Sequence, residues 1–183
     1  MDMDSAHDGD RAAGVAAFDV APDDELRARL RSCCAAETWV ERMVAGRPYR
    51  SEAALYAASD AATAALDADG LAQALAGHPR IGDAPGGHGA DRRSAAWSRG
   101  EQAGVATADA GVRDQLAAAN AEYERRFGHV YLVCAAGRDA AELLAICRSR
   151  LDNDPERERA VVLAELAMIN QLRLGKLLAE PRR

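Results

Sequence analysis

Residues 154–178, DPERERAVVLAELAMINQLRLGKLL, form the pattern on which the fold class depends. A proline and an acidic residue follow Asp154, and both suit the first turn of a helix. The apolar side chains after them recur every three or four positions, which is the spacing of one helix face. We therefore predict a long closing helix that ends near Leu178. Its apolar positions are Val161, Val162, Leu166, Ile169, Leu172 and Leu177.

Segments of the same kind precede this helix along most of the chain. One helix is expected to start at Pro22, and another to follow Asp139 and end at Arg150. The short apolar run at residues 130–134 is either extended or the start of a buried turn. We predict an all-α fold, a single-domain bundle of about eight helices over residues 13–180, after a disordered segment at residues 1–12. The remaining helices are expected near residues 35–44, 51–66, 71–77, 93–103 and 108–127.

Composition agrees with this fold class and excludes several kinds of partner. Of the 183 residues 49% are apolar but only 4% are aromatic, which favours closely packed helices over a sheet. The net charge is −6, and the longest basic clusters, such as Arg92-Arg93, are too short to bind nucleic acid. The sequence therefore predicts no nucleic acid and no membrane as partners. The four cysteines form no C-x-x-C pair, so we expect reduced, buried thiols in a cytoplasmic protein.

A loop rich in glycine and proline, HPRIGDAPGGHGA at residues 78–90, interrupts the helical pattern. His78 opens this loop and precedes a proline, which stiffens the backbone beside its imidazole. The imidazole can serve acid–base chemistry near neutral pH, or it can interact with the last carbonyls of the preceding helix. His78, Asp83 and His88 match no helix-based or knuckle-type metal site, so no metal is predicted.

Two further groups of polar residues are candidates for a site. Ser98, Glu101 and Gln102 share one face if they lie on a helix, where they can hydrogen-bond a polar ring. The same S-x-x-E pattern is also a capping box at the start of a helix, and both interpretations stay open. Arg150 can stabilise a helix C-terminus or pair with a substrate carboxylate, and its neighbours do not decide between these.

Several motifs in order resemble the OHCU decarboxylase family, whose substrate is 2-oxo-4-hydroxy-4-carboxy-5-ureidoimidazoline (OHCU). The resemblance covers about residues 18–178. The motifs are HPRIGD at 78–83, S-x-x-E-Q at 98–102, N-x-x-Y-x-x-x-F-G at 120–128, Arg150-Leu151-x-Asn153, and Arg173-Leu174 in the closing helix.

The resemblance implies a cofactor-independent lyase of purine degradation that converts OHCU into (S)-allantoin. It also implies a homodimer, a small-molecule substrate, and no cofactor or metal. By position in the family motifs, His78 and Glu101 are expected to be catalytic. The rival interpretation is a non-catalytic helical interaction module, in which each of these residues has a purely structural role. Substrate binding is expected from Pro79, Ser98, Gln102, Val130, Tyr131 and Arg150.

Overall fold

The computed structural model describes residues 3–83 and 92–180, and within them it is all-α, with ten helices and no strand. The predicted fold class is therefore confirmed. The prediction of about eight helices missed α1 and the single turn α7. The helices are α1 (Met3–Val20), α2 (Asp23–Cys33), α3 (Glu37–Ala45), α4 (Glu52–Ala64), α5 (Ala68–Ala76), α6 (Arg92–Glu101), α7 (Ala103–Ala106), α8 (Ala110–Phe127), α9 (Ala140–Arg150) and α10 (Pro155–Leu178).

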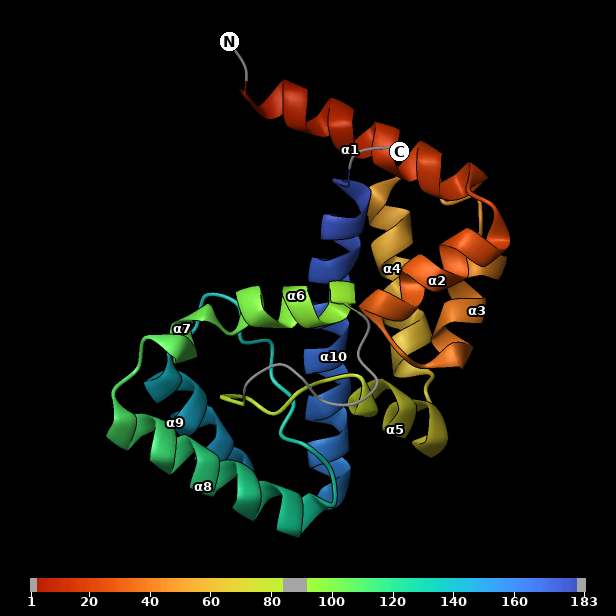
Figure 1. The fold of residues 1–183 in the computed structure, drawn as a ribbon. Helices are drawn as coiled ribbons and strands as arrows, with labels where there is room; N and C mark the ends of the chain where they lie inside the picture. Colours follow the sequence, from red (N-terminus) through yellow and green to blue (C-terminus); the bar gives the residue numbers. More distant parts are fainter. Residues whose placement is uncertain (1–2, 84–91, 181–183) are drawn as a thin grey trace.

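The closing helix α10 runs through the middle of the molecule (Figure 1). Helices α2 to α5 pack along one side of it, and α8 and α9 lie at its lower end on the other side. The main core lies on the α2–α5 side, where the Trp39 ring is fully buried and its Nε1 donates to Ser59 O at 3.3 Å. Val162, Leu166 and Ile169 bring one face of α10 into this core, as the spacing predicts.

A second, smaller core lies between α8 and α9 and includes Tyr123, Leu143 and Cys147. Residues 130–134 form neither helix nor strand, and Tyr131, Leu132 and Val133 within this run are buried. Side chains satisfy its buried backbone groups: Arg150 Nη1 donates to Leu132 O at 2.7 Å, and Cys134 N donates to Glu165 Oε2 at 2.8 Å.

The first helix corrects a sequence prediction. Residues 1–12 were expected to be disordered, yet α1 is helical from Met3 onward. It docks through its second half, where Val15 and Phe18 are buried. Gly14 allows the close approach, because a Cβ at this position would lie 2.5 Å from Leu178 O. The composition of residues 1–12 indicates disorder because it carries no information about such a contact with the far end of the chain.

The described helices contain none that is long and apolar enough to cross a membrane. The four cysteines are free thiols; Cys33, Cys34 and Cys147 are buried and Cys134 is partly buried, close to the prediction.

Candidate functional site

A polar cluster forms where α6 crosses α10. The guanidinium of Arg173, on α10, is only 2% exposed and points at the polar face of α6. Its Nε and Nη2 donate to the two Glu101 carboxylate oxygens at 3.2 and 3.0 Å, and Nη2 also donates to Ser98 Oγ at 3.0 Å. Ser94, one turn before Ser98, accepts a longer bond of 3.4 Å from Nη1. The i, i+4, i+7 spacing of these α6 residues therefore serves one arginine.

Lys176 adds a second positive charge to Glu101. Lys176 lies one turn beyond Arg173. The Nζ of Lys176 donates to Glu101 Oε1 at 2.9 Å and lies 5.8 Å from the Trp97 ring centroid. Burial alone would raise the pKa of Glu101, but the hydrogen bonds and charges of Arg173 and Lys176 outweigh it and hold this pKa below its ordinary value. Glu101 is therefore a carboxylate at neutral pH.

His78 lies near the same charges. It follows the Gly77 C-cap of α5, and its backbone N–H donates to Leu75 O at 3.0 Å. Loss of solvation, with repulsion from Arg173, lowers the pKa of His78 to about 3, and Glu101 opposes this shift. The imidazole is therefore neutral at pH 7. Neither ring nitrogen has a hydrogen-bond partner within residues 3–83 and 92–180.

Hydrogen bonds anchor the loop at residues 78–83 to the end of α6 and to α8. Gly82, at φ 92°, donates its N–H to Gln102 Oε1 at 3.0 Å, which links the loop to the end of α6. Asn120 of α8 donates to Ile81 O at 2.8 Å. On the exposed side, Arg80 makes two bonds of 2.6 Å to a carboxylate of α8. These anchors hold the backbone that follows His78.

The cluster combines groups suited to proton transfer on a polar ring. Neutral His78 can accept or, after protonation, donate a proton. The Glu101 carboxylate can stabilise positive charge that develops on the imidazole. Ser98 and Gln102 add hydrogen-bonding groups beside them.

A family model of OHCU decarboxylase matches residues 19–175. The uric acid degradation bifunctional protein TTL of Arabidopsis thaliana is 30% identical over 149 residues, 81% of this chain and 46% of the relative. The 2-oxo-4-hydroxy-4-carboxy-5-ureidoimidazoline decarboxylase of Amia calva is 39% identical over 88 residues, 47% of this chain and 50% of the relative. A crystal structure of OHCU decarboxylase in the presence of (S)-allantoin aligns with TM-score 0.70 at 27% identity, over 87% of this chain and 100% of that one.

The chain belongs to the OHCU decarboxylase family. It spans about half the length of the curated relatives that it matches.

Within this family member, the structure decides between the interpretations of S-x-x-E. Helix α6 begins at Arg92, so Ser98 and Glu101 lie in its later turns. The capping-box interpretation is therefore wrong, since a cap must precede the first turn. Both side chains point to α10, and Gln102 points to the loop after His78. The structure thus brings together four of the expected site residues.

Arg150 does not join them in the structure, and its substrate-binding role remains a prediction. It is 4% exposed in the second core, where Nε and Nη2 donate to Glu158 Oε1 at 2.9 and 2.5 Å. Nη2 also donates to Tyr123 Oη at 3.2 Å, and the guanidinium lies 5.0 Å from the Tyr131 ring centroid. Together with its bond to Leu132 O, these contacts leave Arg150 as a buried link between α8, α9 and α10.

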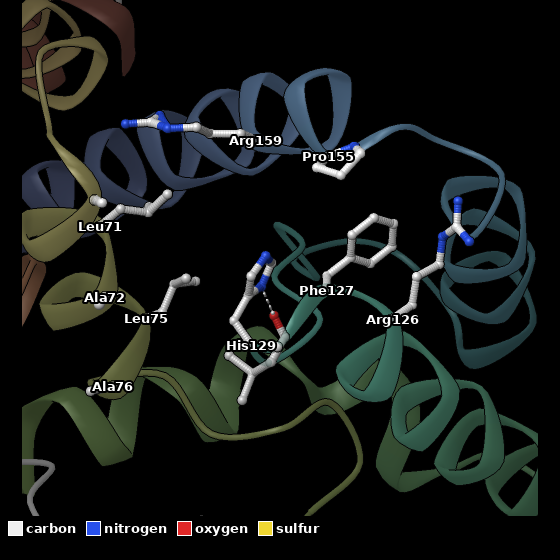
Figure 2. A pocket seen from close by; sticks show the side chains of 12 residues that line it. Leu71, Ala72, Leu75, Ala76, Arg126, Phe127, His129, Pro155 and Arg159 are labelled. Carbon is white, nitrogen blue, oxygen red and sulfur yellow. Dashed lines mark hydrogen bonds between the residues drawn. The ribbon is translucent and has the colours of Figure 1, made fainter.

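The other expected substrate-binding residues are dispersed. Pro79 is partly buried next to His78. Tyr131 is 2% exposed and donates to Leu143 O at 3.1 Å inside the second core, so its side chain is not at the cluster. Val130 lines a separate pocket beside α5 (Figure 2).

Metal ligation receives no support from the part of the chain that the structure describes, where no group of three potential ligand side chains occurs. His88, one of the three residues weighed as metal ligands, lies outside the described residues.

Arg173 is the site residue that sequence reasoning did not assign. A signal for it existed, because Arg173 continues the buried seam of Leu166 and Ile169 at helical spacing. A charged residue in an apolar seam needs a buried partner, and Glu101 is that partner.

Proposed function

We propose that this protein catalyses the decarboxylation of OHCU to (S)-allantoin. Family membership supports this activity, and so does the cluster at the crossing of α6 and α10. The observation that carries the proposal is a cluster in which a neutral imidazole, His78, lies near the Glu101 carboxylate that Arg173 and Lys176 hold by hydrogen bonds.

The substrate itself takes up the electron pair that decarboxylation releases. The bond between the ring carbon and the carboxylate breaks, carbon dioxide leaves, and the electron pair moves toward the adjacent imine, whose nitrogen takes a proton. The resulting enol then loses its hydroxyl proton and gains a proton at the neighbouring carbon. Because the substrate supplies its own electron sink, we propose a reaction that needs no cofactor.

We assign the proton exchanges of the second stage to His78. Its neutral ring accepts the hydroxyl proton, and the imidazolium so formed is stabilised by Glu101. Delivery of a proton to one face of the ring carbon gives the S configuration. Ser98 and Gln102 bind the ring and ureido group, and orientation of this kind supplies several kcal/mol of rate acceleration.

Arg173 acts through Glu101, since its bonds to α6 and to backbone carbonyls occupy its guanidinium. We assign it to positioning and charge. The homodimer and the cytoplasmic location remain predictions.

The experiment generates OHCU in situ from urate with urate oxidase and hydroxyisourate hydrolase, and follows allantoin by circular dichroism. The proposal predicts fast formation of the S enantiomer, unchanged by a metal chelator. Racemic product at the spontaneous rate would refute it and favour the non-catalytic module. Loss of activity with the chelator would refute cofactor independence alone.

A further inference from the structure

A pocket of about 610 Å³ opens between α5, the end of α8 and the start of α10 (Figure 2). This volume lies in the range of small-molecule sites. His78, Ser98 and Glu101 do not line it, so it is separate from the cluster at α6. Its lining residues are Ala68, Leu71, Ala72, Leu75, Ala76, Arg126, Phe127, Gly128, His129, Val130, Pro155 and Arg159.

Two opposite walls of the pocket are apolar. Leu71 and Leu75 of α5 form one wall, and the Phe127 ring stands across from them (Figure 2). The small side chains of Ala72 and Ala76 leave the space between these walls open. Such walls suit a flat apolar body, whose burial is favourable in proportion to its area.

The charged groups of the lining are all of one sign. Arg126 Nη2 donates to Asn153 O at 2.9 Å, and Arg159 Nη2 donates to Leu66 O at 2.6 Å. These partners are carbonyls, and neither arginine has an ion pair within the described residues. The lining contains no carboxylate. The Arg126 guanidinium lies on the side of the Phe127 ring away from Leu71 and Leu75 (Figure 2), so Arg159 is the charge that favours an anion between the walls.

His129 adds a directional polar group between the apolar walls. Its Nδ1 lies 3.0 Å from Val130 O, and a carbonyl only accepts, so Nδ1 carries the hydrogen. The other ring nitrogen points toward the α10 side of the pocket in Figure 2. The ureidoimidazoline of the proposed reaction has polar groups around its ring and does not match these carbon-rich walls.

We propose that this pocket is a second ligand site, which binds a small organic anion with a flat apolar body, of the aromatic carboxylate class.

The probe is 1-naphthoate, with neutral 1-naphthamide as its matched control, titrated into the full chain by calorimetry. We expect 1:1 binding with a Kd below about 1 mM for the carboxylate, and at least tenfold weaker binding of the amide. Equal affinity for the two, or no binding of the carboxylate, would overturn the proposal.

Variants locate the binding. Ala72→Trp fills the pocket from an exposed helix position and should abolish binding, and Ala76→Trp provides a second filling variant if the first does not fold. Arg159→Gln should weaken carboxylate binding at least tenfold. Arg113→Gln removes an exposed arginine of α8 outside the pocket and should change nothing. Full binding by a folded, filled variant would refute the site.

Two further experiments test whether the probe binds elsewhere and whether a second copy of the chain fills the pocket. Glu101→Gln should bind 1-naphthoate normally, and loss of binding there would assign the probe to the reaction cluster. Binding that appears only when the protein is diluted would assign the pocket to a second copy of the chain. Either result would overturn the proposal.

Discussion

Arg173 and Glu101 are 72 positions apart and form a two-point ion pair, with Nε–Oε1 at 3.2 Å and Nη2–Oε2 at 3.0 Å. The pair joins α6 to the central helix and sets the charge beside His78. If the proposed function holds, stability and catalysis are therefore coupled at this one contact.

Arg173→Met should destabilise the fold by about 3 kcal/mol, because it leaves a largely buried carboxylate with Lys176 alone. Arg173→Met combined with Glu101→Leu should recover at least about 1 kcal/mol relative to the sum of the single changes. Urea unfolding of the four proteins measures this coupling. Strictly additive effects would mean that the ion pair makes no net contribution to the free energy of unfolding.

Lys176→Met should shift the acidic limb of the kcat/KM profile to higher pH. Glu101 acts as a carboxylate, so activity falls as pH drops through its pKa, and loss of a neighbouring positive charge raises that pKa. Lys176→Arg should retain the original profile. An unchanged profile in a folded Lys176→Met protein would show that the lysine does not influence Glu101.

Lys176 is the only lysine in the sequence, so amine-reactive labelling offers an independent measure of its environment.

His78 should make the fold less stable in acid. Its folded pKa, about 3, lies below the ordinary 6.5, so the unfolded chain binds the extra proton between these values. The contribution is fully present above about pH 6.5 and is lost as pH falls toward 3, with a slope of at most about 1.4 kcal/mol per pH unit. His78→Gln should flatten the measured stability curve across this window. An equally steep curve would place the titration elsewhere.

Arg150→Met should act on stability rather than catalysis. The change leaves the Glu158 carboxylate buried beside Tyr123, which costs about 3–5 kcal/mol. Well below its melting temperature, the folded variant should keep a kcat within about threefold of the unchanged protein, a difference of at most about 0.65 kcal/mol in activation free energy. Arg148→Met, on the exposed face of the same helix, is the control. A selective rise in KM with unchanged stability would restore a substrate-binding role for Arg150.

Local patterns predicted most of the helices because apolar spacing and helix-start residues are encoded within a few positions. Local patterns did not predict helix α1, which packs on the other end of the chain where Gly14 closely approaches Leu178. The site was only partly predictable for the same reason. Ser98 and Glu101 share a face by spacing alone, whereas their contact with Arg173 depends on where α6 crosses α10.

The measurement that tests the central claim most directly is the circular dichroism of allantoin formed from in situ OHCU by the unchanged protein, His78→Gln and Arg113→Gln. The account predicts rapid S product from the unchanged protein and from Arg113→Gln, and product at the spontaneous rate from a folded His78→Gln protein. Rapid formation of S product by His78→Gln would contradict it.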